Sequence, residues 1–285
     1  MQGSPLIAAG YTAEWSVRGA AVRALRHGDR DLITSWPAEG PVPFYAGTIL
    51  APWPNRVGQA SYRFGGREHH LEVTEPDRGH ALHGLVATAD WRPVEQVAVE
   101  EEQAWVRLAH AVTPVAGYPF TLDLEVTHRL DAGGLTTTLT AANRGADPAP
   151  YGCGPHPWLV GEELELPAGR VLLTDAALLP AELAEVAATP YDFGQARTTA
   201  GVDVDHAFTG LAEGRARVGG VLMEWDPAVL PWVQVCTGAQ LGYRGVAVEP
   251  MTCPPDAFNS GDDLITLAPG QSHSASWTIR SARPE

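Results

Sequence analysis

Short runs in which apolar and polar residues alternate make up much of the chain, and glycine or proline separates one run from the next. Thr121–Leu130 is the clearest run, because Leu122, Leu124 and Val126 share one face while Thr, Asp and Glu occupy the other. A period of two with one polar face is typical of an antiparallel strand that is half exposed to solvent. We interpret three further runs as antiparallel strands beside it: Trp91–Val99, Ala104–Val112 and Leu135–Ala142.

Glycine-rich turns indicate how successive strands connect. The sequence DAGG at 131–134 closes a hairpin between Thr121–Leu130 and Leu135–Ala142. A second hairpin is expected where Gly65-Gly66 separates Ser61–Phe64 from Arg67–Val73. Two-residue turns that contain glycine suit such hairpins, because glycine adopts the positive φ that they require.

The pattern as a whole predicts an all-β fold. Helical turns are expected only near Ala181–Ala188, where the flanking prolines keep them short. No linker or repeat divides the sequence, so residues 1–285 are predicted to form one domain, a large antiparallel β-sandwich of two layers. Further short strands are expected at Glu14–Val17, Ala20–Leu25, Asp31–Ile33, Arg170–Leu173, Val229–Cys236 and Ser276–Arg280.

The composition agrees with this fold and argues against some partners. A chain of 285 residues with 45% hydrophobic and 19% charged residues can bury a sizeable core. Its formal net charge of −15 argues against binding to nucleic acid or to an anionic membrane. We find no run of about 18 apolar residues that would span a membrane, and the first ten residues lack the pattern of a secretory signal. We therefore expect a cytoplasmic protein.

A carboxylate at the end of an apolar strand is the first candidate for chemistry. In the stretch Gly245–Gly261, the apolar residues Val246–Val248 lead directly to Glu249, and Pro250 follows. Carboxylates are rarely buried unless they are paired or functional, and proline stiffens the chain that holds this one. The position fits a catalytic group, and it also fits a carboxylate that caps a loop or pairs with an arginine.

Four other polar residues lie in constrained loops: Arg56 in PNR, His83 in HALHG, His156 in GPHP and Asp205 in VDVDHAF. Each alone also fits a structural role, as a salt-bridge arginine, a hydrogen-bonded histidine or a turn-forming aspartate. Together with Glu249 they fit general acid–base chemistry near neutral pH. In that interpretation Arg56 and Asp205 hold hydroxyl groups of a ligand.

Nine tryptophans offer flat apolar surfaces on which a sugar ring can pack. Trp53, Trp158 and Trp232 lie close in sequence to the polar candidates, and we expect Trp232 to contact the substrate. Packing in the core is the alternative for each of them.

An ordered set of motifs resembles the aldose 1-epimerase (galactose mutarotase) family, most closely its compact bacterial members. The resemblance covers most of the chain, and it implies a β-supersandwich fold and interconversion of the α and β anomers of a free aldose. It also implies a small-molecule sugar as ligand, with neither a metal nor an organic cofactor. The motifs are GTILAPWPNRVGQASYRFGG (47–66), ALHGL (81–85), GPHPWL (154–159), TPYDF…DVDHAFTGL (189–211) and GVAVEPMTCPPDAFNSG (245–261).

The resemblance also implies a role for each candidate residue. Glu249 is the general base that takes the proton of the C1 hydroxyl, and His156 is the general acid that protonates the ring oxygen. His83 assists near that oxygen, while Arg56 and Asp205 hold the sugar hydroxyls. One motif departs from the family pattern, in which His-Pro is followed by Tyr or Phe. Here Trp158 follows, and a bulkier aromatic at this position is expected to change which sugar fits.

Other functions remain open from the sequence. An epimerase of phosphorylated or otherwise anionic sugars needs more basic residues near the site than Arg56, and Arg244 is the next candidate. A glycosidase would use Glu249 and Asp205 as its carboxylate pair. A sugar-binding module without catalysis would not need the acid–base set.

A metal site would draw on His156 and the three cysteines, Cys153, Cys236 and Cys253. Zinc sites usually contain two short ligand pairs, and only Cys153-x-x-His156 has that spacing. The cysteines are odd in number and scattered, which favours free buried thiols over disulfides or a metal.

Overall fold

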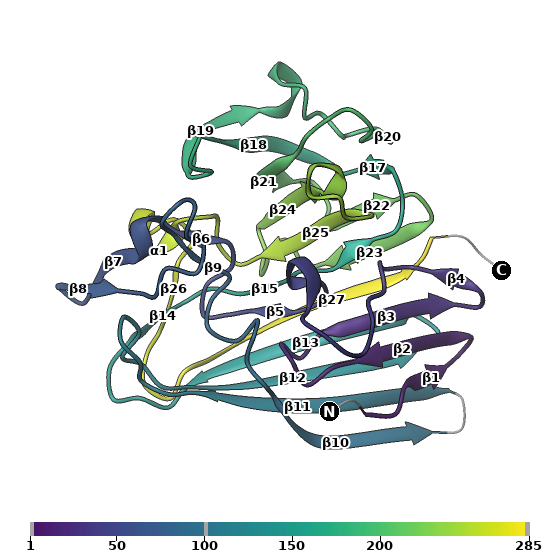
Figure 1. The fold of residues 1–285 in the computed structure, drawn as a ribbon, viewed down its shortest axis with the longest axis horizontal. Coiled ribbons are helices and arrows are strands. Elements are labelled where there is room, and N and C mark those ends of the chain that lie inside the picture. The colour runs from purple at the N-terminus through teal and green to yellow at the C-terminus, as the bar shows by residue number, and fades with distance from the viewer. Residues whose placement is uncertain (1–2, 100–101, 283–285) are drawn as a thin grey trace.

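The computed structural model of the protein describes residues 3–99 and 102–282 (Figure 1). Within these residues an antiparallel sheet of nine strands extends from one end of the molecule to the other. Its order is β10-β11-β12-β13-β27-β23-β22-β17-β20. The strands are β10 (Arg92–Val99), β11 (Gln103–Val112), β12 (Leu122–Asp131), β13 (Gly134–Asn143), β27 (Ser272–Ser281), β23 (Val221–Trp225), β22 (Arg215–Val218), β17 (Glu163–Glu165) and β20 (Arg197–Thr198).

A six-stranded antiparallel sheet and a four-stranded N-terminal sheet complete the main layers. The first has the order β16-β25-β24-β21-β18-β19 and the second the order β1-β2-β3-β4. Their strands are β16 (Trp158–Leu159), β25 (Val246–Met251), β24 (Trp232–Thr237), β21 (Asp205–Leu211), β18 (Ala168–Thr174), β19 (Pro180–Glu185), β1 (Leu6–Ala8), β2 (Tyr11–Trp15), β3 (Val22–His27) and β4 (Arg30–Asp31).

Short strand pairs and single helical turns connect these layers. The pairs are β5 (Ile49–Leu50) with β15 (Gly154–Pro155), β6 (Arg56–Val57) with β9 (Ala81–Leu82), β7 (Ser61–Phe64) with β8 (Arg67–His70), and β14 (Ala149–Tyr151) with β26 (Ile265–Leu267). The helical turns are α1 (Ala257–Ser260), η1 (Pro43–Tyr45), η2 (Gly58–Ala60), η3 (Val186–Ala188) and η4 (Gly238–Leu241).

The two smaller sheets lie at different ends of the nine-stranded sheet (Figure 1). The N-terminal sheet packs against the nine-stranded sheet through β1, which contacts β11 and β12. The six-stranded sheet lies in the upper part of the view, beside β22 and β23. A large cluster of buried apolar side chains includes Leu6 near the start, Val233 on the six-stranded sheet and Ile279 near the end. The predicted all-β antiparallel sandwich is therefore confirmed.

The alternation in the sequence reappears as alternating burial. Along β12 the buried side chains include Leu122, Leu124 and Val126, and those between them are exposed or half-buried. Both predicted hairpins are present: β12 turns into β13, and β7 turns into β8 through Gly65 and Gly66 with positive φ.

The predicted helical turns at Ala181–Ala188 are largely wrong. Residues 180–185 form strand β19, and only Val186–Ala188 makes a helical turn. The reason is tertiary pairing, since Leu183 lies opposite Leu172 of β18, and such pairing outweighs the modest helix preference of Ala, Leu and Glu. No helix among residues 3–99 and 102–282 is long and apolar enough to cross a membrane.

Candidate active site

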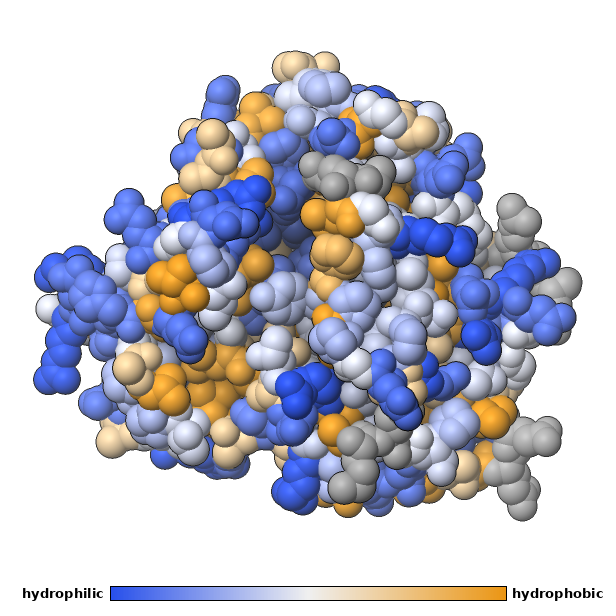
Figure 2. Space-filling model, in the orientation of Figure 1, coloured by the Kyte–Doolittle hydropathy of each residue, from blue (hydrophilic) through white to orange (hydrophobic). Residues whose placement is uncertain are grey.

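A cavity of about 470 Å³ opens on one face of the six-stranded sheet. Its floor is formed by strands β21, β24 and β25, and its walls by loops that include Tyr45, Arg56, Glu75 and His83. Figure 2 shows the surface hollowed above the centre of the view, with hydrophilic residues on the left of the hollow and apolar residues on its right. Cavities of this size commonly hold small ligands.

The strand register places four side chains on the cavity floor. Gln234 of β24 lies directly opposite Glu249 of β25, and Asp205 of β21 lies opposite Cys236 of β24. Successive side chains of a strand point to opposite faces. The intervening residues, such as Val248, therefore face the apolar core while these four line the cavity.

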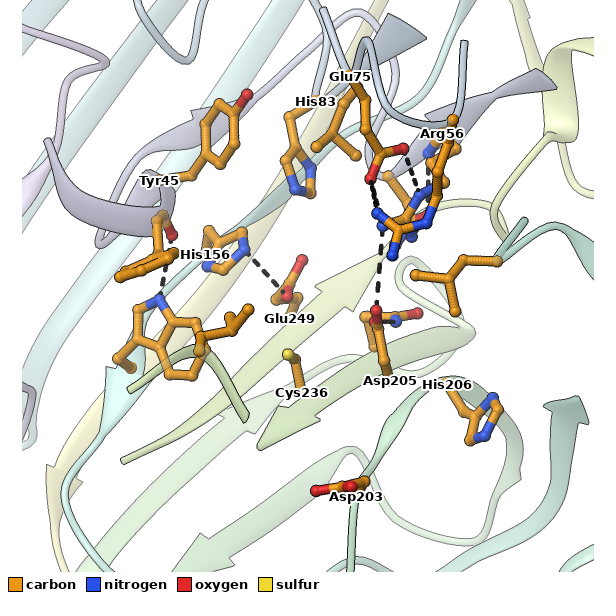
Figure 3. Close-up of a pocket in the computed structure, with 18 residues that line it drawn as sticks. Tyr45, Arg56, Glu75, His83, His156, Asp203, Asp205, His206, Cys236 and Glu249 are labelled. Atoms are coloured by element: carbon orange, nitrogen blue, oxygen red, sulfur yellow. Dashed lines mark hydrogen bonds and ion pairs between the residues drawn. The ribbon is translucent and has the colours of Figure 1, made fainter. Parts of the chain in front are cut away.

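Glu249 is the most deeply buried carboxylate of the cavity, with 1% of its side chain exposed. Its Oε1 lies 3.3 Å from Nε2 of His156, and its Oε2 has no hydrogen-bond partner among the described residues (Figure 3). Burial raises the pKa of Glu249 well above its usual range, and the charge of Asp205 adds to this while Arg56 opposes it. The free oxygen can accept a hydrogen bond from a ligand.

His156 is fixed by the pairing of β15 with β5. Its backbone N–H donates to the carbonyl of Thr48 at 3.0 Å, and its carbonyl accepts from the N–H of Gly47 at 2.8 Å. Gly154 is required here, since a Cβ would lie 2.5 Å from the carbonyl oxygen of Pro250. Burial lowers the pKa of His156 to about 4, so the unliganded imidazole is neutral at pH 7.

His83 follows β9 in a left-handed conformation, with φ of +62°. Its N–H donates to the carbonyl of Asn55 at 2.8 Å, and Gly84 after it has φ of +74°. A Cβ on Gly84 would lie 2.1 Å from the carbonyl oxygen of Ala51, so only glycine fits. The ring of His83 stands edge-on to that of His156, with 5.0 Å between the ring centroids. Burial lowers the pKa of His83 well below its usual value, and the neighbouring His156, when protonated, and Arg56 lower it further.

Arg56 is buried and held by carboxylates on two sides. Its Nε and Nη2 donate to the two oxygens of Glu75 at 2.9 and 3.0 Å, and Nη2 lies 3.9 Å from Oδ2 of Asp205. Its Nη1 is 3.4 Å from the side-chain oxygen of Asn55. Figure 3 shows the guanidinium between Glu75 and Asp205, beside Glu249. The group is therefore rigidly placed at the edge of the cavity.

The sequence did not single out Gln234, Glu75 or Tyr45, all of which line the cavity. Gln234 is buried; its Nε2 donates to Oδ1 of Asp205 at 2.7 Å, and its Oε1 has no partner among the described residues. A polar residue inside the apolar run WVQVC was the available signal for Gln234. Nothing in the turn-like stretch TEPDRG distinguished Glu75 from an exposed loop residue.

Trp232, which the sequence suggested as a substrate contact, does not line this cavity, so its contact with the substrate stays a prediction. Trp232 lies two residues before Gln234 on β24, about 7 Å further along the strand. Its Nε1 donates to Oδ2 of Asp263 at 2.7 Å, and its ring packs beside Met251 and lines a separate depression. The tryptophan that lines the cavity is Trp158, whose Nε1 donates to the carbonyl of Phe44 at 3.1 Å.

The structure also locates arginines other than Arg56. Arg78 lines the cavity and donates to Glu75 at 2.9 Å. Arg244 borders a different depression, and Arg18 pairs with Asp90 on the surface. Arg56 and Arg78 are thus the cations in the lining of this cavity.

The three cysteines and His156 were the residues considered for a metal site. Cys153 and Cys253 are buried free thiols, and burial raises the pKa of each to about 12. Cys236 lies on the cavity floor. Across the described part of the chain, no group of three or more His, Cys, Asp or Glu side chains has an arrangement that could hold a metal ion.

Solved structures share this fold. A putative aldose 1-epimerase from Escherichia coli K12 superposes with a TM-score of 0.81 at 24% identity, covering 97% of this chain and 98% of that one. A galactose 1-epimerase from Lactobacillus acidophilus NCFM gives a TM-score of 0.79 at 20% identity, covering 96% of this chain and 92% of that one. The fold is therefore that of galactose mutarotase-like proteins.

The sequence comparison gives the family. The model of the aldose 1-epimerase family matches residues 6–280, so the chain belongs to this family. The uncharacterized protein YihR of Escherichia coli strain K12 is 34% identical over 301 residues, which cover 98% of this chain and 92% of that protein. Family membership makes carbohydrate epimerisation the class of reaction to consider.

Proposed function

We propose that the protein interconverts the α and β anomers of a free aldose by opening and reclosing the sugar ring. The observation that carries this proposal is the buried pair formed by Glu249 and His156, 3.3 Å apart inside the cavity. The hydroxyl oxygen O1 and the ring oxygen O5 are bonded to the same carbon, C1. A base and an acid that serve these two oxygens must therefore lie close together, as this pair does.

The reaction uses Glu249 as base and His156 as acid. The Glu249 carboxylate takes the proton of the C1 hydroxyl while the His156 imidazolium gives its proton to O5. The C1–O5 bond breaks and a C1 carbonyl forms. Rotation about C1–C2 presents the other face of the carbonyl to the O5 hydroxyl. The two proton transfers then run in reverse, which closes the ring as the other anomer and restores both groups.

The coupled protonation of the pair supports these roles. Burial raises the pKa of Glu249 and lowers that of His156, so in the empty cavity their shared proton resides on the carboxyl group. Moving that proton to the imidazole produces the carboxylate base and the imidazolium acid in one step. A carboxylate whose pKa is raised is also a stronger base than an ordinary one.

Three other groups are suited to hold the sugar. Arg56 donates hydrogen bonds, Asp205 accepts them, and Gln234 presents a buried carbonyl oxygen that has no partner among the described residues. His83 lies edge-on to His156 and within the same wall, where it assists at O5. Trp158 supplies an apolar surface for the ring.

Polarimetry of freshly dissolved α-D-glucose and α-D-galactose tests the proposal, with wild type and Glu249→Gln side by side. We expect wild type to accelerate the change in optical rotation and the variant to lose about 10²- to 10⁴-fold in rate, because it lacks the base. A variant that kept wild-type turnover would show that Glu249 is not the base. If neither sugar responds, anomer-resolved NMR with phosphorylated and modified aldoses decides whether any aldose is a substrate.

An aldose that carries an anionic group is the second candidate, and Arg78 is the observation that favours it. Arg78 lines the cavity with 40% of its side chain exposed, and it shares Glu75 with Arg56. An anionic substituent can pair with this guanidinium. D-Glucose 6-phosphate and D-glucuronate in the same NMR assay distinguish this candidate, since it predicts a lower KM for them than for D-glucose.

A further inference from the structure

Glu75 lies beside Arg56 in the cavity wall (Figure 3) and accepts hydrogen bonds from two arginines. Its Oε2 accepts from Nε of Arg56 at 2.9 Å, and its Oε1 accepts from Nη2 of Arg56 at 3.0 Å and from Nη1 of Arg78 at 2.9 Å. Paired bonds of this kind fix the plane of a guanidinium as well as its position. Arg56 therefore has one edge bound to Glu75.

The backbone holds Glu75 firmly in this position. Its carbonyl accepts the N–H groups of Arg78, Gly79 and His80 at 3.2, 2.9 and 3.3 Å, and its own N–H donates to the carbonyl of His80 at 3.0 Å. The loop is thus closed on itself by four hydrogen bonds. A loop closed in this way keeps the carboxylate in one place.

His80 ties this loop to the rest of the cavity wall. Its ring Nδ1 accepts from the N–H of Gln59 at 3.1 Å, so the proton of the neutral ring is on Nε2. That Nε2–H donates to the carbonyl of Ala177 at 3.1 Å. The loop that carries Glu75 is therefore anchored on both sides, at η2 and at residues 175–179.

Glu75 remains charged at neutral pH. Burial by itself would raise its pKa, but the hydrogen bonds and charges of Arg56 and Arg78 outweigh burial and hold the pKa of Glu75 below its usual value. Arg56 is itself buried, and a buried cation requires a close anion. Asp205, at 3.9 Å, is a longer contact than Glu75.

We infer that Glu75 is a positioning residue for sugar binding: it orients Arg56 toward the ligand and neutralises its charge, so that the guanidinium donates to a sugar hydroxyl instead of capturing an anion. This inference rests on the proposed function for the identity of the ligand. Glu75 acts through Arg56, and no contact of its own with the sugar is required. Glu75 binds Nε and Nη2 of Arg56 and leaves Nη1, which lies 3.4 Å from the side-chain oxygen of Asn55. Nη2 also lies 3.9 Å from Oδ2 of Asp205.

Glu75→Gln tests this role, and the chain offers a matched control. Glu165 also accepts two hydrogen bonds from one arginine, Arg217, at 3.1 and 2.8 Å, and pairs with a second, Arg215, at 3.2 Å. It lies on β17 in the nine-stranded sheet and does not line the cavity. Glu165→Gln therefore removes an equivalent carboxylate without touching the proposed site.

We expect Glu75→Gln to raise KM for the aldose about tenfold or more while kcat changes less than about threefold, since a binding contact is loosened and the acid–base pair stays. Glu165→Gln is expected to keep wild-type KM and kcat. Thermal melts of both variants verify folding. Equal KM values for Glu75→Gln and wild type would overturn the inference.

Binding of inorganic sulfate gives a readout that does not depend on turnover. Glu75→Gln leaves Arg56 and Arg78 under-neutralised, so we expect it to bind sulfate at least about fivefold more tightly than wild type. Titration calorimetry measures this, and unchanged sulfate affinity would count against the role of Glu75. If wild type proves inactive on every aldose, the proposed function fails while the sulfate comparison still tests Glu75.

Glu75→Asp keeps the inference testable if the glutamine variant folds poorly. Aspartate retains the charge on a side chain shorter by one methylene, so it neutralises the arginines but positions Arg56 less well. We expect an intermediate KM and no gain in sulfate affinity. A variant that instead gained sulfate affinity would show that the charge of residue 75 does not control anion binding.

Discussion

Glu249 illustrates at the residue scale how the requirements of chemistry and of stability oppose each other. Burial raises its pKa, as does the charge of Asp205, so the ionised form, which is the base of the proposed reaction, is disfavoured in the folded protein. His156 is disfavoured as a cation for the same reason. In the proposed reaction this pair is reactive because neither charged form is solvated by water.

The stability of Glu249→Gln should therefore exceed that of wild type, increasingly so at high pH. Between the unfolded-chain pKa of 4.5 and the raised folded value, the folded protein holds more protons than the unfolded chain. Wild-type stability consequently falls as the pH rises through this window, whereas glutamine does not titrate. Urea unfolding at pH 5 and pH 8 measures the difference, which we expect to be larger at pH 8.

Glu165→Gln is the control with the opposite sign. The hydrogen bond from Arg217 lowers the pKa of Glu165, so its ionised form stabilises the fold above its unfolded pKa. This variant should lose stability at pH 8 relative to wild type. A gap between Glu249→Gln and wild type that stayed constant with pH would contradict a raised pKa for Glu249.

Individual site residues differed in how far the sequence could predict them. Proline and glycine next to His83, His156 and Glu249 indicated that these side chains are held in place, and the structure brings them into one cavity with Arg56 and Asp205. Glu75 could not be predicted, because its role depends on the position of an arginine 19 residues away in sequence.

At the scale of elements, the catalytic candidates His83 and His156 are positioned by glycines that let two backbone segments approach each other closely. Gly84 lies between His83 and the loop that carries Ala51, and there is no space for a side chain. Gly154 plays the same part for His156. These turns explain why histidines in loops can be held as firmly as residues on strands.

Gly84→Ala should therefore reduce both stability and catalysis. The new Cβ would meet the carbonyl oxygen of Ala51 at 2.1 Å, and a backbone atom cannot move aside without shifting His83. We expect a loss of about 2 kcal/mol or more in unfolding free energy and at least about a tenfold fall in kcat/KM. Urea unfolding and polarimetry measure the two effects.

Gly270→Ala separates the clash from backbone strain. Gly270 has φ of +77°, close to that of Gly84, but a Cβ there meets nothing within 4 Å. This control should lose only about 1–2 kcal/mol for the left-handed conformation and keep wild-type kcat/KM. If both variants lost activity equally, the close approach at Gly84 would not be the cause.

Element type was predictable where local signals were strong and unpredictable where long-range pairing decided. The alternation of β12 and the Gly65-Gly66 turn gave correct strands and hairpins. The Ala- and Glu-rich segment of β19 indicated helical turns, yet pairing with β18 makes it a strand. Local propensity is worth only tenths of a kcal/mol per residue, and sheet pairing outweighs it.

At the scale of the whole molecule, the C-terminal strand β27 joins two parts of the nine-stranded sheet. It pairs with β13 on one side and with β23 on the other. Leu139 of β13, opposite Ala275 of β27, is fully buried in the main core. This part of the sheet supports the fold without lining the candidate active site.

Leu139→Ala should destabilise the protein by about 2–5 kcal/mol, because it leaves a cavity in a packed core. Kinetic constants of the folded variant should match those of wild type, since the site lies on the other sheet. Thr138→Ala, on the exposed face of the same strand, is the control and should change stability by less than about 1 kcal/mol. Urea unfolding measures the stability of both variants, and polarimetry measures their rates. A change in kcat for Leu139→Ala would show that the two sheets are coupled.

The sequence alone determined the class of fold and the residues most worth testing. A strand with one buried face needs an apolar residue at every second position, and this pattern is visible in the sequence. Glycine and proline constrain the backbone at their own positions, so turns can be recognised from the sequence as well. Tertiary structure decided which groups meet. The register of β24 with β25 puts Gln234 opposite Glu249. Trp232 lies on the same face of β24 but outside the cavity, where it lines a separate depression. A loop closed by its own hydrogen bonds brings Glu75 to Arg56. Such distances depend on how remote segments pair and pack, which no local preference encodes.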